Sequence, residues 1–352
     1  MINEHLKVGG MQYGFVKNGG CDKAIFAVQN VVNYYMKRHT NVYIVTLDAS
    51  AAFDRVNGYA LLSKLIDKNV PPEIIRVLLS WYSVSHACVR IDDIITDNID
   101  IHSGVKQGGI MSPHMYNVYV DDLMTKLLCE KLGCMIGHFL YSAIFYADDI
   151  ILMSASRRKM QKMIDICNEY GLQYGICFNA KKSKWFFAGK HDECTGVSIK
   201  LGDNVIDHEW DSLTYLGVKF VVERQALVID VKDRIRKFNS SAYSVLLNSS
   251  DLSEIVRCEI IVKECLPVLT YGLGCGLVWP ADVYKLHIAY RKIFRYIFKL
   301  SLRAHLTELL NIFGIDSVEN ILNRKWVGLM SNCMCCCFPE ICFLAKCVMI
   351  DS

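Results

Sequence analysis

The sequence lacks a long uninterrupted apolar run. Its most apolar stretch, residues 260–279, contains Lys263, Glu264 and Pro267 together with three glycines, so it is a poor membrane span. The N-terminus also lacks the charged-then-apolar pattern of a secretion signal, because it carries Glu4 and then a Gly-Gly pair. We therefore expect an intracellular protein, cytoplasmic or nuclear, that is neither secreted nor bound to a membrane.

The 16 cysteines have no regular spacing, and no signal peptide accompanies them, which favours reduced thiols over a disulfide framework. Six gather near the C-terminus: Cys333, Cys335, Cys336, Cys337, Cys342 and Cys347. Their spacing does not match a zinc knuckle, and no His lies among or after them. With Phe338 and Phe343 nearby, the group is more typical of a buried apolar tail, and zinc is the alternative.

The sequence also lacks a strong excess of charge, since its net charge of +3 does not by itself require a nucleic-acid partner. We find no internal repeat and no low-complexity segment. A hydrophobic content of 52% and a mean hydropathy of +0.22 exclude a disordered protein. A chain of 352 residues can form two or three domains with a real core.

Hydrophobic periodicity predicts the main elements of the first half. The expected elements are a helix over 22–37, a core strand over 41–48 that ends in an acid, two helices over 59–83 broken at Asn69 and Pro71-Pro72, and strand-like residues over 88–101. A glycine-bearing loop over 104–113 should lead into a helix that begins with Ser112 as N-cap and Pro113 at its first position, and that runs to about Leu132.

The second half shows fewer strands and more helix. We expect a helix over 157–170 that Gly171 closes, and further strands within 178–187 and 214–222. From residue 226 onward the pattern becomes mostly helical, so we place a boundary near Arg224.

Two adjacent acids, Asp148 and Asp149, interrupt an apolar, β-prone run over 144–153 that contains no Gly or Pro. Such a run predicts a buried hairpin with the acids at its turn. Ionised carboxylates are costly in that setting unless a cation offsets their charge.

Asp48, at the end of a predicted buried strand, is a third candidate for binding such a cation. Two-metal phosphoryl transfer needs acids from separate segments to converge on cations about 3.5–4 Å apart, and Mg²⁺ prefers oxygen ligands.

These acids lie in segments that resemble the reverse transcriptases of LINE-type (non-LTR) retrotransposons. Residues 47–56 (Leu-Asp-Ala-Ser-Ala-Ala-Phe-Asp-Arg-Val) are similar to motif A of that family, and residues 145–150 (Phe-Tyr-Ala-Asp-Asp-Ile) to motif C. The other matching segments are 12–15, which precedes motif A, 104–108 with Ser112, Pro113 and Asn117 for motif B, 179–183 for motif D, and 215–217 for motif E. The six segments follow the family order, so a chance match is very improbable.

The resemblance implies an α+β right-hand polymerase: partial fingers over 1–40, a palm with an antiparallel sheet over 41–224, a helical thumb over 225–304, and a helical, Cys-rich tail over 305–352. It implies RNA-directed DNA polymerase activity, in which dNTPs are added to the 3′-hydroxyl of a DNA primer on an RNA template. Two Mg²⁺ ions would serve as cofactors, with Mn²⁺ as a possible substitute.

The resemblance also implies roles for individual residues. Asp48, Asp148 and Asp149 would hold the metals, and Lys182 would donate a proton to the departing pyrophosphate. The expected nucleotide pocket consists of Phe53, Gln107, Gly108 and Tyr146, with Phe53 as the steric gate against a ribose 2′-hydroxyl. The expected primer grip is Tyr215, Leu216 and Gly217. Taken alone, Phe53 would be an ordinary core aromatic and Lys182 a solvated surface lysine.

Two basic stretches are candidates for phosphate contacts. Lys232, Arg234 and Arg236 crowd one segment, and Arg291, Arg295 and Lys299 recur every four residues, which predicts one basic stripe on a helix. A solvated amphipathic face is the alternative for either stretch.

Residues 119–122 (Tyr-Val-Asp-Asp) imitate the acidic box of the hairpin. They fall inside the helix predicted from Ser112, where Asp122 could pair with Lys126 four residues later. We therefore favour residues 146–149 as the metal-binding box.

The chain departs from the family pattern at its start, because it begins almost at Gln12 and lacks the earlier finger motifs and any endonuclease-like region. We interpret it as an N-terminally truncated enzyme. The alternative is a decayed, inactive fragment that at most binds nucleic acid. RNA-directed RNA polymerase activity is disfavoured by Phe53.

Overall fold

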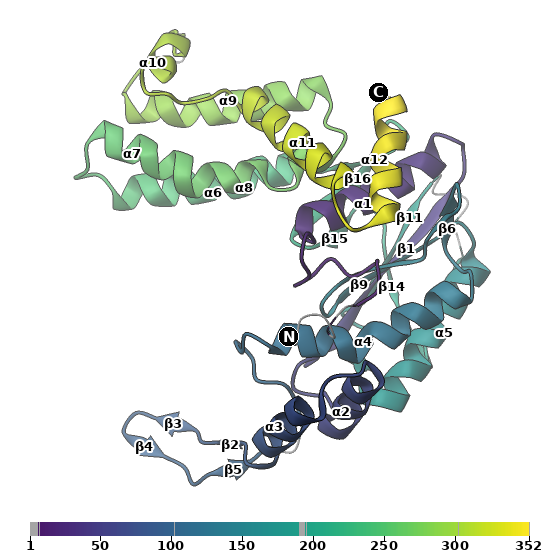
Figure 1. Cartoon of the computed structure of the whole chain (residues 1–352). Helices are drawn as coiled ribbons and strands as arrows, with labels where there is room; N and C mark the ends of the chain where they lie inside the picture. The colour runs from purple at the N-terminus through teal and green to yellow at the C-terminus, as the bar shows by residue number, and fades with distance from the viewer. Residues whose placement is uncertain are drawn as a thin grey trace. The chain divides into compact units, whose positions relative to one another are not determined.

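The computed structural model describes residues 6, 8–101, 103–189, 194, 196–301 and 303–351, the last without its side chain. The chain forms two compact units: residues 1–20 with 38–210, and residues 21–37 with 211–352 (Figure 1). The first residues of the expected fingers, 1–5 and 7, and the last residue of the expected tail, Ser352, lie outside the described part. Within that part, no helix is long and apolar enough to cross a membrane.

A six-stranded sheet forms the centre of unit 1, with strand order β14-β11-β1-β9-β8 and β10 paired to β1. All neighbours are antiparallel except β11 and β14. The strands are β1 (Val42–Ser50), β8 (Ala143–Tyr146), β9 (Asp149–Ser154), β10 (Cys177–Phe178), β11 (Lys184–Ala188) and β14 (Asp207–Glu209). In β9 every residue after Asp149 is buried, because an apolar β-branched run suits the middle of a covered sheet.

Around this sheet, the described part of unit 1 contains four α-helices and several short strands. The helices are α2 (Gly58–Asp67), α3 (Pro72–Ser83), α4 (Ser112–Cys129) and α5 (Arg157–Tyr174). The short strands are β2 (His86–Ala87), β3 (Arg90–Ile91), β4 (Ile94–Ile95), β5 (Ile99–Asp100), β6 (Cys134–Ile136), β7 (Phe139–Tyr141), β12 (Lys200–Leu201) and β13 (Asn204–Val205). Helices α4 and α5 pack against each other, and α5 packs on β9. Strands β2 to β5 form an exposed ladder that extends beyond α3 (Figure 1).

Unit 2 is mainly helical and includes one antiparallel three-stranded sheet, β15-β16-β17. Its strands are β15 (Leu213–Tyr215), β16 (Val218–Glu223) and β17 (Ala226–Ile229). Its helices are α1 (Cys21–Met36), α6 (Val231–Asn248), α7 (Glu254–Ile260), the π-helix η3 (Ile261–Cys265), α8 (Leu266–Thr270), the 3₁₀-helix η4 (Leu273–Cys275), α9 (Pro280–Ile297), α10 (Thr307–Ile312), α11 (Val318–Met334) and α12 (Pro339–Asp351). The boundary expected near Arg224 falls at the turn between β16 and β17.

Most predicted elements are confirmed, including the hairpin of β8 and β9, the two helices α2 and α3, and helix α1. The ends of two helices were predicted wrongly. Met111, not Ser112, is the N-cap of α4, and the Ser112 hydroxyl donates to the Lys106 carbonyl instead of capping. Helix α5 continues to Tyr174 and ends at Gly175 in the left-handed conformation (φ 72°), while Gly171 is buried inside it.

Candidate active site

The carboxylates of Asp48 and Asp149 lie on neighbouring strands. Strand β1 pairs with β9 so that Asp48 stands opposite Asp149, and β8 pairs with β9 so that Tyr146 also stands opposite Asp149. Asp148 occupies the two-residue turn between β8 and β9. The structure therefore brings Asp48 close to two acids that lie about a hundred residues later in the sequence, as the motifs predicted.

Burial and the neighbouring carboxylates raise the pKa values of Asp148 and Asp149. Desolvation, and after it the nearby Asp48 carboxylate, raises the pKa of Asp148. Desolvation, Asp148 and Asp48 raise the pKa of Asp149 in the same way, although Asp149 keeps solvent access. The site thus concentrates negative charge, which a bound cation would relieve.

The segment expected to form motif D is fastened to β1 at Asp48. The Asp48 N–H donates to the Ser183 hydroxyl at 3.1 Å, and the Asn179 N–H donates to the Asp48 carbonyl at 2.9 Å. The Asn179 side chain accepts from the N–H groups of Lys181 and Lys182, which closes the turn. As a result Lys182 Nζ lies 3.9 Å from Asp48 Oδ2 while its side chain stays 65% exposed.

The donor atoms at this site suit a hard divalent cation, because all three side chains offer carboxylate oxygens. Among the described residues, no group of three or more His, Cys, Asp or Glu side chains is already arranged as a metal site.

The loop predicted as motif B lies against the loop that follows β1. The Val105 N–H donates to the Phe53 carbonyl at 2.8 Å, and Gln107 Nε2 lies 3.3 Å from Asp54 Oδ1. Gly104 has a φ of 99° and approaches so closely that a Cβ there would lie 3.0 Å from the Asp54 backbone. Gln107 and Gly108 are exposed, so their side of the loop is open to a ligand.

Phe53 is half-buried and stacks on Tyr116 of α4, with ring centroids 5.1 Å apart and an interplanar angle of 24°. Tyr116 is fully buried, and desolvation, followed by the charge of Asp148, raises its pKa. This electrostatic coupling indicates that the Phe53–Tyr116 stack lies near the hairpin turn. Tyr116 is not among the residues that the motifs predicted for the site.

The acidic look-alike at residues 119–122 is part of a structural network. Asp121 is paired with Lys68 at 2.7 Å and accepts from the Gly9 N–H at 2.8 Å. Asp122 pairs with Lys64 of α2, not with Lys126 as predicted, because the two helices lie side by side. Lys64 is only 6% exposed, and its ammonium lies 4.0 Å from the ring centroid of Tyr174. Both acids therefore hold α2 against α4.

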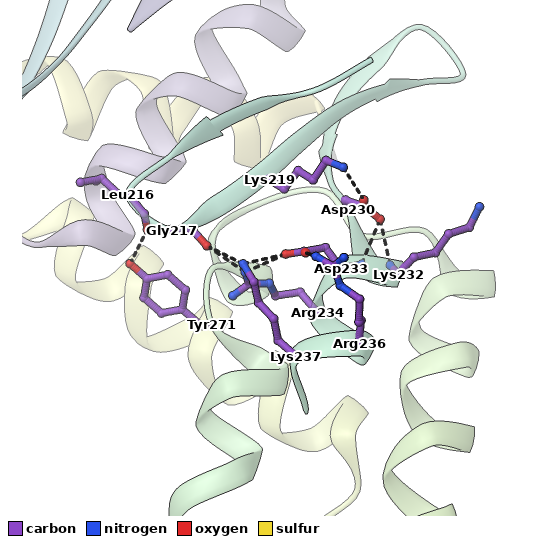
Figure 2. A network of polar contacts seen from close by, with 10 residues as sticks. All are labelled: Leu216, Gly217, Lys219, Asp230, Lys232, Asp233, Arg234, Arg236, Lys237 and Tyr271. Carbon is purple, nitrogen blue, oxygen red and sulfur yellow. Dashed lines mark hydrogen bonds and ion pairs between the residues drawn. The ribbon is translucent and has the colours of Figure 1, made fainter. Parts of the chain in front are cut away.

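The turn between β15 and β16 carries the residues expected to form the primer grip. Tyr215 is buried, whereas Leu216 (φ 47°) and Gly217 (φ 72°) turn the chain in the left-handed conformation. Figure 2 shows how both carbonyls of the turn are engaged: the Tyr271 hydroxyl donates to Leu216 O at 3.0 Å, and Arg234 donates to Gly217 O at 2.8 Å.

The first basic stretch differs from its prediction at Arg234. That residue is 3% exposed and paired with buried Asp233 at 3.0 Å, so its guanidinium cannot face a phosphate (Figure 2). Burial alone raises the pKa of Asp233, but hydrogen bonds from Lys237, Arg234 and Arg236 outweigh it and lower the pKa to about 2. Arg236 and Lys232 remain exposed.

The predicted continuous stripe through Arg291, Arg295 and Lys299 is wrong, because α9 ends at Ile297. Lys299 follows the helix with a φ of 52°. Arg291 donates to the Thr307 hydroxyl at 3.0 Å, and Arg295 donates to the Ala304 carbonyl at 3.4 Å. Both arginines therefore contact the segment that follows α9.

The C-terminal cysteines lie on and between α11 and α12. Cys333 is buried, and desolvation raises its pKa to about 12, so it stays a thiol at neutral pH. Cys336 Sγ and Cys342 Sγ are 3.8 Å apart.

A family model described as "Reverse transcriptase (RNA-dependent DNA polymerase)" matches residues 1–220. The chain is 26% identical over 228 residues to the Retrovirus-related Pol polyprotein from type-2 retrotransposable element R2DM of Drosophila melanogaster, covering 62% of this chain and 21% of that protein. It is 24% identical over 301 residues to the RNA-directed DNA polymerase from mobile element jockey of the same species, covering 81% of this chain and 31% of that protein. The chain thus spans less than a third of the length of either relative.

The structure is also similar to that of telomerase from Candida albicans in complex with a TWJ fragment of telomeric RNA. The TM-score is 0.49 at 13% identity, and the match covers 99% of this chain and 53% of that one.

Proposed function

Because the chain belongs to the reverse transcriptase family, we propose that it is an RNA-directed DNA polymerase of a non-LTR retrotransposon. It adds dNTPs to a primer 3′-hydroxyl on an RNA template. The observation that carries this proposal is the pairing of Asp48 with Asp149 across β1 and β9, with Asp148 at the adjoining turn. In this proposal the fold is a right-hand polymerase with fingers over 1–40, a palm over 41–224, a thumb over 225–304 and a tail over 305–352.

Asp48, Asp148 and Asp149 hold two Mg²⁺ ions, or Mn²⁺ in their place. When bound, such ions lower the pKa of an attacking hydroxyl and neutralise charge on the leaving phosphates. The raised pKa values of Asp148 and Asp149 support this assignment, because desolvation and the neighbouring carboxylates disfavour their charged forms and a bound cation would offset both effects. Lys182 stands at the edge of the site with an exposed ammonium, from which it can protonate the departing pyrophosphate.

The incoming nucleotide occupies the surface formed by Phe53, Tyr146, Gln107 and Gly108. Phe53 cannot move away from a ribose 2′-hydroxyl easily, because its ring is stacked on buried Tyr116. Tyr146 stands opposite Asp149 at the hairpin and would support the base or sugar. Gln107, held near Asp54, leaves its loop exposed toward the template strand.

The primer end is gripped by the turn of Tyr215, Leu216 and Gly217, where Gly217 offers exposed backbone. Exposed Lys232, Arg236 and Lys299 are the candidates for phosphate contacts along the nucleic acid. Arg291 and Arg295 are partly exposed and could add to this surface beside their contacts with Thr307 and Ala304.

The experiment is primer extension on a homopolymeric RNA template with a complementary DNA primer, dNTPs and Mg²⁺. We expect extension by the wild-type chain and its loss on addition of EDTA or on Asp148→Ala and Asp149→Ala. A chain that binds the template-primer in a mobility-shift assay without extending it would support the inactive, nucleic-acid-binding alternative. Extension that persists in both variants would overturn the site assignment.

A further inference from the structure

Residues 11–14 run beside the hairpin of β8 and β9 and are joined to it by an isolated β-bridge. The Phe145 N–H donates to the Met11 carbonyl at 2.9 Å, and the Tyr13 N–H donates to the Phe145 carbonyl at 2.9 Å, which gives a parallel bridge between Gln12 and Phe145. This segment matched a family motif in the sequence, but neither the carboxylates nor the nucleotide pocket gives it a role.

The side chain of Gln12 reaches the turn between β8 and β9. It is 1% exposed, and its Oε1 accepts from the N–H groups of Gly14 at 2.9 Å and Ala147 at 3.2 Å. Its Nε2 donates to Asn117 Oδ1 at 2.9 Å, and Asn117 Nδ2 donates to the Gly14 carbonyl at 2.8 Å. The two buried amides and the Gly14 backbone thus form a closed ring of hydrogen bonds, and the Ala147 N–H of the turn is attached to this ring through Gln12 Oε1.

Ala147 needs such support. It is 2% exposed and has a φ of 55°, a left-handed conformation that side-chain-bearing residues rarely adopt without tertiary contacts. Its buried N–H would lack an acceptor without Gln12 Oε1. Gly14 lies directly against the turn, because a Cβ there would stand 2.7 Å from the Ala147 nitrogen. The residue held in this way immediately precedes Asp148.

We propose that Gln12 and Asn117 are positioning residues that fix the Ala147 turn and thereby set where Asp148 and Asp149 present their oxygens. An amide is the only side chain of this length that accepts from two N–H groups and also donates to Asn117. Methionine has nearly the same shape and can neither donate nor accept strongly, so Gln12→Met removes the hydrogen bonds with little change in volume.

The test rests on the proposed metal-binding function and has two readouts on the full chain, hydrogen exchange of residues 144–153 and Mn²⁺ binding measured by electron paramagnetic resonance. Gln29→Met is the matched control. Gln29 is a fully buried glutamine on α1 that donates to the Leu227 and Leu277 carbonyls. We expect Gln12→Met to raise the exchange rate of the hairpin at least tenfold and to weaken Mn²⁺ binding about tenfold, because small displacements of a preorganised site are costly. The control should change neither.

Asn117→Leu provides a second variant, with the same expected direction and a smaller effect, because Gln12 still accepts from Ala147. Unchanged hairpin exchange in Gln12→Met, or an equal change in Gln29→Met, would overturn the proposal. If the wild-type chain binds no Mn²⁺, the proposed function fails, and hairpin exchange still decides whether Gln12 holds the turn.

Discussion

At the scale of single side chains, the two acidic pairs differ in what surrounds them. Asp121 and Asp122 each face a lysine from α2 or its end, and their charges are already neutralised. Asp148 and Asp149 face other carboxylates, and desolvation, followed by this repulsion, raises their pKa values. Ion pairs between helices stabilise the fold, whereas a group of like charges is unfavourable until a cation binds.

Phe53 gives the first prediction at this scale. In Phe53→Val the ring that stacks on Tyr116 is lost, so space opens where a ribose 2′-hydroxyl would lie. We expect the preference for dNTPs over rNTPs, measured as the ratio of kcat/KM values, to fall roughly 10–100-fold. Phe53→Tyr keeps the ring and should keep most of the preference. An unchanged ratio in Phe53→Val would contradict the role of Phe53.

Arg234 gives the second prediction, which concerns stability. Arg234→Met leaves the buried Asp233 carboxylate with weaker compensation, and we expect the free energy of unfolding to fall by about 3–5 kcal/mol. Arg236→Met is the matched control, because Arg236 pairs with the same carboxylate while its side chain is 78% exposed. That change should cost about 1 kcal/mol or less. The free energy of unfolding is measured by urea unfolding. An equal decrease in the two variants would contradict the claim that the buried arginine contributes more than the exposed one.

At the scale of elements, the periodicity of apolar residues predicted where strands and helices occur, and the structure shows which contacts set their ends. The hairpin over 144–153 was predictable because an apolar β-prone run surrounds two acids. The start of α4 was not, because the Ser112 hydroxyl is used by the Lys106 carbonyl. The end of α9 at Ile297 could not be predicted either, because basic residues continue at helical spacing beyond it.

Helix α12 gives a prediction about pH. Burial of Glu340 in its first turn raises the pKa of this carboxyl from 4.5 to about 7. Between these values the folded chain binds a proton that the unfolded chain has released. The stabilising contribution is therefore present below pH 4.5 and is lost as the pH rises through about 7. The difference amounts to roughly 3 kcal/mol.

Urea unfolding at pH 5 and pH 8 checks this prediction. Glu340→Gln stays neutral, so it should reduce the loss of stability between the two pH values. Glu319→Gln, at the exposed first turn of α11, should behave like the wild type. A Glu340→Gln variant with the wild-type pH dependence would refute the assignment.

At the scale of the whole molecule, motif order along the chain indicated the family and the acids, but not the tertiary neighbours. Neither the hydrogen bonds that join Gln12 to Asn117 and Ala147 nor the pair of Lys64 and Asp122 could be predicted, because each joins residues far apart in the sequence without a local pattern. The placement of α1 was hidden for the same reason. Its apolar stripe predicted a helix, and the structure places that helix in unit 2 with α12 and β17, although β1 of unit 1 follows it directly.

The most direct measurement compares the two acidic boxes in one primer-extension assay on a homopolymeric RNA template with Mg²⁺. Asp149→Asn and Asp122→Asn remove the same charge from an aromatic-x-Asp-Asp sequence, and the fraction of folded protein is determined for each. We predict that Asp149→Asn lowers extension per folded molecule about 10³-fold or more, because a proposed metal ligand is lost. We predict that Asp122→Asn lowers stability and retains extension per folded molecule. Retained extension in Asp149→Asn, or its loss in Asp122→Asn alone, would contradict the assignment of the hairpin as the catalytic centre.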